Sequence, residues 1–337
     1  MDKLQEIFKS NHKIIPYLKL AEKTNKKLSV QINLTNKCSS KCKSCRKYEW
    51  PQIELDLKSI NNVLWNLADH DCETITFSGG EPLLYSKFKD IKIPDTLKVN
   101  VLTSLVVDKA KVEHLLKIAN SIQVSLDGHN KQMFEQIRGV DAFDLVINNL
   151  KYLKNNLNSN QRLRINCTVS KSNATWVKEI FFLAQNIGVD INFYPVHTWE
   201  NLKLDENNWL MIGAQIKQVK EIINGELIEI EPVKTNLFNL SRHQEPLAPI
   251  CIIHKIHAVV DANGDVYPCC HLLNDNGEYG KQNEFSSGNI YTDTYLNCFE
   301  HQFNYLPKSP ECLQCNRYRS INNLYYQYTK CNQQIYL

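Results

Sequence analysis

The regular alternation of strand-like and helix-like segments limits the fold of this chain more than any other feature of its sequence. Strands are expected over six stretches: residues 28–34, 74–77, 97–102, 121–126, 163–169 and 189–196. Helices with apolar residues three and four positions apart are expected over residues 57–68, 108–119, 142–153 and 175–186. This alternation predicts a parallel sheet covered by helices. Six β/α units are too few for an eight-stranded barrel, so a doubly wound sheet and a partial barrel both remain open.

Composition and charge exclude several classes of protein. The 337 residues are 43% apolar and 22% charged, which is ordinary for a globular protein. No stretch of about 18 apolar residues occurs, and the N-terminal residues lack the apolar core of a secretion signal. The net charge of +3 is too small to indicate a nucleic-acid partner. We therefore expect a cytoplasmic protein with no membrane or nucleic-acid partner.

The pattern changes after about residue 230, where prolines and turn residues replace the long helices. Asn263-Gly264 lies between two short apolar runs, which predicts a β-hairpin. We expect three parts: a helical extension over residues 1–27, the β/α region over 28–235, and a C-terminal domain over 236–337.

Cysteines are unusually frequent and clustered. With no export signal, 12 cysteines indicate metal ligation rather than disulfides. Cys38, Cys42 and Cys45 follow the first strand, and three thiolates so close in sequence can converge on one soft metal centre. Three thiolates leave one iron of an iron–sulfur cube open, whereas a structural zinc normally takes four protein ligands. On this motif alone, an iron–sulfur cluster and a zinc with a distant fourth ligand both remain open.

A glycine pair follows the second strand in Ser78-Gly79-Gly80-Glu81-Pro82. Adjacent glycines allow the backbone to approach a ligand closely, and a carboxylate such as that of Glu81 can accept hydrogen bonds from an ammonium group. In a parallel sheet this segment lies at the same edge as the cysteine loop. The sequence therefore predicts a ligand site beside the three cysteines.

A second set of cysteines lies in the C-terminal part of the chain. It consists of Cys251, Cys269, Cys312 and Cys315, with Cys270 as an alternative to Cys269. The predicted hairpin brings the segment before Cys269 back toward Cys251, and a Cys-x-x-Cys pair completes four thiolates. Taken alone, this spacing is typical of a zinc ribbon.

Together, the Cys-x3-Cys-x2-Cys motif and Gly-Gly-Glu-Pro resemble the radical S-adenosylmethionine (SAM) superfamily, over about residues 28–200. The resemblance implies an α/β fold, a partial (β/α)6 TIM-like barrel. It also implies that Cys38, Cys42 and Cys45 hold a [4Fe–4S] cluster whose open iron takes SAM. Reductive cleavage of SAM would then give a 5′-deoxyadenosyl radical that abstracts a hydrogen atom from the substrate.

The same resemblance implies which residues contact SAM. They are Ser78, Gly79, Gly80 and Glu81 at the methionine amino group, Thr103 and Ser104 at the ribose, Ser125 and Asp127 at the end of the fourth strand, and Arg138 in the segment that follows. Ser44 departs from the pattern, because the family usually has an aromatic residue before the third cysteine.

The second cysteine set resembles the SPASM/twitch extension of the same superfamily, which implies an α+β C-terminal domain. Two further cysteines of the full SPASM form would fall at Ile321 and Tyr325 and are absent. The resemblance therefore implies a twitch-type domain with one auxiliary [4Fe–4S] cluster. Its ligands would be Cys251, Cys269, Cys312 and Cys315.

The remaining cysteines have a simpler interpretation. We expect Cys72, Cys167 and Cys298 to be buried small apolar residues. The alternative role is donation of a hydrogen atom to a substrate radical. The candidates for a hydrogen donor or a substrate contact are Cys167, Cys331, His197 and Lys171.

The function that we expect is oxidation or epimerisation of a small polar metabolite such as a sugar, cyclitol or nucleoside. The auxiliary cluster would accept the electron, and flavodoxin or ferredoxin would be the reducing partner. The alternative is a peptide- or protein-modifying maturase. With about 37 residues before Cys38, we expect no separate peptide-binding domain at the N-terminal end.

Two other functions fit less well. A molybdopterin-type cyclase would end in Gly-Gly, whereas this chain ends Gln334-Ile335-Tyr336-Leu337. A two-zinc scaffold would leave the Gly-Gly-Glu-Pro segment and Ser125-Leu126-Asp127-Gly128 unexplained.

Overall fold

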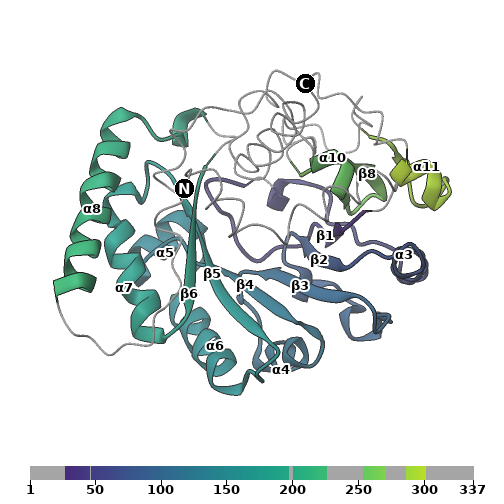
Figure 1. Ribbon diagram of the computed structural model, residues 1–337, viewed down its shortest axis with the longest axis horizontal. Helices are drawn as coiled ribbons and strands as arrows, with labels where there is room; N and C mark the ends of the chain where they lie inside the picture. Colours follow the sequence, from purple (N-terminus) through teal and green to yellow (C-terminus); the bar gives the residue numbers. More distant parts are fainter. Residues whose placement is uncertain (1–26, 46, 197–199, 226–252, 271–285, 301–337) are drawn as a thin grey trace, which may run out of the picture.

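The computed structural model describes residues 27–45, 47–196, 200–225, 253–270 and 286–300. Six parallel strands lie side by side in chain order (Figure 1). They are β1 (Ser29–Thr35), β2 (Thr74–Gly79), β3 (Lys98–Thr103), β4 (Ser121–Ser125), β5 (Arg162–Val169) and β6 (Asp190–Pro195). A doubly wound sheet reverses its strand order at a switch point. The unbroken order from β1 to β6 instead gives the α/β fold expected from the sequence, consistent with a partial barrel.

Helices cover the outer side of this sheet (Figure 1). They are α3 (Leu57–Asp69), α4 (Lys109–Ile118), α5 (Lys131–Arg138), α6 (Phe143–Asn156), α7 (Val177–Ile187) and α8 (Glu206–Gly225). The short 3-10 turns are η1 (Lys47–Glu49), η2 (Pro82–Leu84), η3 (Phe88–Asp90), η4 (Ala174–Trp176) and η5 (Glu200–Leu202). Asp56, Asp108 and Asn130 cap the N-termini of α3, α4 and α5. The sequence predicted α3, α4, α6 and α7 but not α5 or α8.

The two faces of the sheet differ in chemistry because side chains alternate along each strand. Toward the helices the strands present an apolar, buried surface that includes Phe77, Val101, Val124, Ile165 and Phe193. The opposite, inner face carries polar side chains in matching register. Its residues include Gln31, Asn33, Thr76, Asn100, Gln123, Asn166 and Asn192.

A C-terminal hairpin extends the barrel sheet beyond β1. The strand β7 (His257–Val260) pairs in parallel with β1, and β8 (Asp265–Tyr267) and β9 (Gly288–Asn289) continue the sheet antiparallel. Two short helices flank the hairpin, α10 (Ile253–Ile256) and α11 (Tyr295–Glu300). The hairpin predicted at Asn263-Gly264 is present, with Gly264 at a φ of +91°. The expected boundary between residues 235 and 236 lies outside the described residues.

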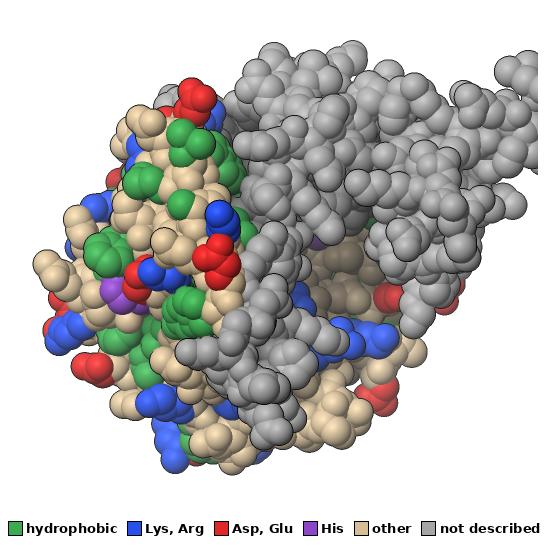
Figure 2. Space-filling view, turned by 60° about the vertical axis from the view of Figure 1, so that its left-hand side comes forward, with side chains coloured by type: hydrophobic (Ala, Val, Ile, Leu, Met, Phe, Trp, Pro, Cys, Tyr) green, Lys and Arg blue, Asp and Glu red, His purple; other side chains and the backbone are tan. Residues whose placement is uncertain are grey.

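The side of the molecule formed by α7 and α8 is chemically mixed (Figure 2). Apolar, acidic and basic side chains are interspersed in this view. The exposed apolar residues of η4 and α8 include Trp176 and Leu210. None of the helices in the described residues is long and apolar enough to cross a membrane.

Candidate functional site

The carboxyl ends of β1 to β4 surround the loop that contains Cys38, Cys42 and Cys45. The loop directly follows β1, and parallel strands place their carboxyl ends at one edge of the sheet. The three thiols are half-buried and form no disulfide. Besides contacts of residues 36–39 with residues 51–54 and Val106, this cysteine loop, residues 36–45, is held by two segments at the ends of β2 and α5.

The first contact is made by Gly79, Gly80 and Glu81, which we term the β2 clamp. The Gly80 N–H donates to the carbonyl oxygen of Thr35 at 2.7 Å, and the Glu81 N–H donates to that of Lys37 at 2.7 Å. A Cβ on Gly80 would lie 2.3 Å from the Lys37 oxygen, so only glycine fits there. The glycine pair thus packs the second strand end against the start of the cysteine loop.

The Glu81 side chain is fully buried and ties the ends of β2 and β3 together. Its carboxylate accepts hydrogen bonds from the Thr103 hydroxyl (2.8 Å), the Ser104 N–H (2.7 Å), the Ser104 hydroxyl (2.6 Å) and the Leu83 N–H (3.2 Å). Burial raises the pKa of Glu81, and these hydrogen bonds offset only part of that effect. Three of the residues that the sequence assigned to SAM therefore bind one another, and their contact with SAM stays a prediction.

The second contact is made by Ile137, Arg138 and Gly139 at the end of α5, which we term the α5 clamp. The Lys41 N–H donates to the Arg138 carbonyl at 2.9 Å, and the Lys43 N–H donates to the Ile137 carbonyl at 3.0 Å. Gly139 ends the helix at a φ of +64°, and a Cβ there would lie 2.5 Å from the Lys41 oxygen. The free carbonyls at the helix end thus bind the middle of the cysteine loop.

The α5 clamp also carries a charge to one of the cysteines. The Arg138 Nε lies 2.8 Å from the Asp127 carboxylate, and its Nη1 donates to the Cys42 sulfur at 3.6 Å. The other Asp127 oxygen accepts the Thr168 N–H at 2.7 Å. Burial raises the pKa of Asp127, and Arg138 opposes that rise. For Arg138, burial lowers the pKa, but the Asp127 carboxylate and Cys42 outweigh it, so this side chain stays charged.

The donor set of the cysteine loop fits an iron–sulfur cluster with one open iron, because it offers three thiols from one short loop. Burial raises the pKa of Cys38 to about 11, with further contributions from Glu81, Cys42 and Cys45. Within the described ranges, no three ligand-type side chains converge closely enough to hold a metal ion as they stand.

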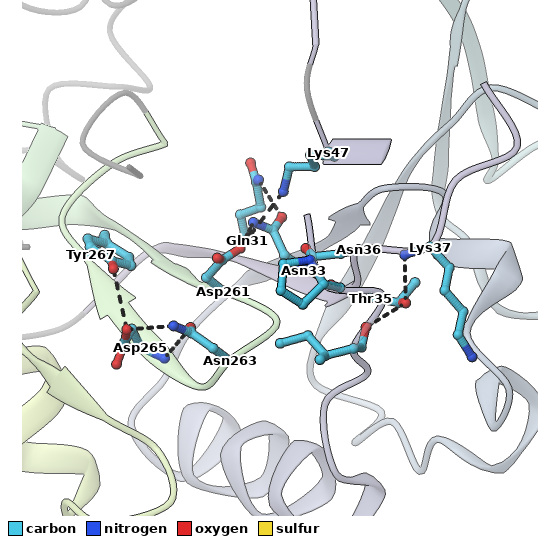
Figure 3. Close-up of polar contacts among 12 residues, drawn as sticks. Gln31, Asn33, Thr35, Asn36, Lys37, Lys47, Asp261, Asn263, Asp265 and Tyr267 are labelled. Carbon is cyan, nitrogen blue, oxygen red and sulfur yellow. Dashed lines mark hydrogen bonds and ion pairs between the residues drawn. The ribbon is translucent and has the colours of Figure 1, made fainter. Parts of the chain in front are cut away.

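A buried polar network joins β1 and η1 to the C-terminal hairpin (Figure 3). The Gln31 amide donates to the Asn33 carbonyl oxygen at 2.9 Å, and the Asn33 amide donates to the Asp261 carboxylate at 2.7 Å. The Lys47 ammonium lies 3.8 Å from the same Asp261 oxygen and 5.1 Å from the centre of the Trp50 ring. Sequence reasoning missed Asn33, Lys47 and Asp261, because only the pairing of β1 with β7 brings them together.

The structure places several other predicted residues. Ser125 ends β4, and its register partner is Asn166 on the inner face. Lys171 is exposed and lies 3.3 Å from Asp205, so its ammonium already has a carboxylate partner. Cys269 and Cys270 are half-buried just after β8. His197, Cys251, Cys312, Cys315 and Cys331 lie outside the described residues.

Cys72, Cys167 and Cys298 are buried, as predicted, with exposed fractions of 3%, 0% and 1%. On β5, Cys167 alternates with Asn166 and shares the helix-facing side with Ile165 and Val169. Its sulfur contacts the Asn173 amide at 3.8 Å. This position favours the packing role of Cys167 over hydrogen donation at the inner face.

Two stretches of the chain match known domain families. Residues 32–169 match the radical SAM superfamily. Residues 251–316 match SPASM, an iron–sulfur cluster-binding domain, and this stretch contains all four cysteines of the second set.

Three curated relatives show where the similarity extends. The mycofactocin maturase MftC of Mycolicibacterium smegmatis is 23% identical over 304 residues, which cover 85% of this chain and 74% of MftC. A probable GTP 3′,8-cyclase of Sulfurisphaera tokodaii is 29% identical over 188 residues, covering 51% of this chain and 58% of that protein. The sporulation killing factor maturation protein SkfB of Bacillus subtilis is 30% identical over 173 residues, covering 49% of this chain and 41% of SkfB. The chain thus spans less than two thirds of the last two relatives.

A solved structure shares the fold. Streptococcus suis SuiB, bound to precursor peptide SuiA, superposes with a TM-score of 0.63 at 17% sequence identity. The match covers 94% of this chain and 75% of that one.

Proposed function

Since this chain belongs to the radical SAM superfamily and carries a SPASM domain at its C-terminal end, we propose that it modifies a peptide or protein substrate. It binds SAM and a [4Fe–4S] cluster, and its SPASM domain binds auxiliary iron–sulfur clusters. When bound, SAM and its cluster supply a carbon-centred radical that abstracts a hydrogen atom from the substrate.

The observation that carries the proposal is the similarity to MftC, a maturase, over 85% of this chain. A second maturation protein, SkfB, supports it over 49% of the chain, and the fold accepts a precursor peptide in SuiB. The cyclase similarity covers only 51% of the chain. These comparisons favour peptide modification over the small-metabolite oxidation that the sequence favoured.

The inner face of the sheet supports a peptide substrate chemically. It carries amide side chains on adjacent strands, and the Asn166 amide donates to the Gln123 carbonyl oxygen at 2.7 Å. An amide side chain both donates and accepts, so it can pair with the N–H and C=O groups of an extended peptide. Gln31, Asn33 and Asn192 add three further amides to the same face.

Each part of the site has a role in this proposal. Cys38, Cys42 and Cys45 hold the SAM cluster, and the two clamps fix the loop that presents them. Cys251, Cys269, Cys312 and Cys315 would hold the auxiliary [4Fe–4S] cluster, which would supply an electron acceptor for the substrate radical. Ser125 and the backbone of the β2 clamp contact SAM, and flavodoxin or ferredoxin supplies the electron that starts each turnover.

The test pairs the anaerobically reconstituted protein with short peptides encoded beside its gene, with SAM and dithionite. We expect 5′-deoxyadenosine to form together with a mass change in one peptide, both measured by mass spectrometry. The matched control is the triple variant Cys38→Ala/Cys42→Ala/Cys45→Ala, which should bind about four irons where the wild type binds about eight, at four per cluster. Peptide-independent turnover of a sugar or nucleoside would instead restore the small-metabolite function.

A further inference from the structure

Arg138 occupies a position that its predicted contact with SAM does not explain. Its side chain is only 11% exposed, and it lies between a carboxylate and a cysteine of the cluster loop. The backbone around it is fixed, because the Arg138 carbonyl accepts the Lys41 N–H and Gly139 closes the helix behind it. The guanidinium is thus held against the cysteine loop by its own main chain.

The guanidinium of Arg138 contacts two partners, through an ion pair at Nε and a hydrogen bond from Nη1. The Nε group faces Asp127, and the Nη1 group faces the Cys42 sulfur, so the planar guanidinium bridges the two. Asp127 cannot turn away easily, since its second oxygen accepts the Thr168 N–H and its carbonyl accepts the Asn173 amide at 2.9 Å. The carboxylate therefore fixes the orientation of the group that reaches the sulfur.

A buried cation beside a ligating sulfur has a defined electrostatic consequence. Reduction of an iron–sulfur cluster adds one negative charge, and hydrogen bonds to its sulfurs and nearby positive charge stabilise that reduced form. Asp127 opposes the effect, because its negative charge lies on the far side of the same guanidinium. Arg138 thus stabilises the reduced form of the cluster, and Asp127 destabilises it.

We propose that Arg138 raises the reduction potential of the SAM cluster through Cys42, and that Asp127 orients Arg138 and limits this rise. The inference rests on the proposed function in one respect, the assignment of Cys42 as a cluster ligand. It assigns Arg138 and Asp127 to the cluster instead of to SAM.

The test is a potentiometric titration, followed by electron paramagnetic resonance, of reconstituted protein without SAM. A Cys312→Ala/Cys315→Ala background removes the auxiliary signal. In Arg138→Gln we expect the midpoint to move to more negative potential by about 59 mV, a tenfold change in a one-electron equilibrium. In Asp127→Asn we expect a move to more positive potential, and in Arg138→Lys a smaller negative move than in Arg138→Gln.

Loosened packing alone cannot shift the midpoint potential in opposite directions in Arg138→Gln and Asp127→Asn. The midpoint potential is compared in each variant, Arg138→Gln or Asp127→Asn, that takes up iron. If that potential is unchanged while SAM binds more weakly, the proposal is overturned and Arg138 belongs to the SAM site. Loss of iron in Cys42→Ala tests the ligand assignment separately. If Cys42→Ala keeps all its iron, the failure belongs to the proposed function and not to Arg138.

Discussion

The β2 clamp and the α5 clamp hold the same loop by different means. The β2 clamp contacts the start of the cysteine loop through neutral backbone groups, and its carboxylate, Glu81, is satisfied by hydroxyls and N–H groups. The α5 clamp contacts the middle of the loop and adds the charged pair of Asp127 and Arg138. The β2 clamp sets the path of the loop, and its carboxylate contributes to the raised pKa of Cys38. The α5 clamp instead brings a cation within hydrogen-bonding reach of the Cys42 sulfur.

The largest expected loss of folding stability comes from breaking the ion pair of the α5 clamp. Asp127→Asn leaves the Arg138 charge buried without its carboxylate, and breaking a buried pair in this way costs about 3–5 kcal/mol. Urea unfolding of the cluster-free protein measures the loss. Asp141→Asn is the matched control, because Asp141 is an exposed partner of Lys131 and its loss should be unmeasurable. Equal stability of the two variants would show that the pair contributes nothing.

The next largest effect is expected from substitution of one glycine in each clamp. Gly80→Ala and Gly139→Ala each place a Cβ against a carbonyl oxygen of the cysteine loop, and overpacking of this kind costs about 1–3 kcal/mol. We expect both variants to take up less iron at the SAM cluster. Gly213→Ala on α8 is the control, since no atom lies within 4 Å of its added Cβ. Full iron content in both clamp variants would mean that the loop is positioned by other contacts.

Glu81→Gln tests the β2 clamp. One donor to Glu81 loses its acceptor, which costs about 1–3 kcal/mol. Because burial raises the pKa of Glu81, the folded wild type holds this proton more tightly than the unfolded chain. Its contribution to stability is therefore present below the unfolded pKa of about 4.3 and is lost as the pH rises through the folded pKa. As the pH rises across this range, the free energy of unfolding should fall more steeply in the wild type than in Glu81→Gln. Parallel curves of unfolding free energy against pH would contradict the raised pKa.

The smallest effect is expected on the helix-facing side, away from both clamps. Cys167→Ala removes one buried sulfur and should cost about 1 kcal/mol, with product formation unchanged. Loss of product with normal stability would make Cys167 a hydrogen donor after all. The neighbouring variant Asn166→Ala, on the inner face, should reduce turnover without a comparable loss of stability.

The sequence predicted the six barrel strands and four of the helices because their signals are local. Alternation such as that of Ile165, Asn166 and Cys167 can be read within one strand. Helix α5 was missed although its buried Met133, Phe134 and Ile137 lie at helical spacing, and it carries the clamp that reaches Cys42. The contacts of Glu81 and Asp261 depend on residues far away in sequence, so no local pattern could reveal them.

The pairing of β7 with β1 has a consequence for how the protein is made. Asn33 and Asp261 are 228 residues apart, so the ladder between their strands cannot form until the ribosome has passed most of the chain. At a translation rate of about 5–20 residues per second, the edge of β1 that pairs with β7 stays unpaired for about 10–50 s. An unpaired strand edge is a site where chains aggregate. During that interval the nascent barrel needs a chaperone or fast folding of its other strands, and yield should therefore be sensitive to the speed of translation.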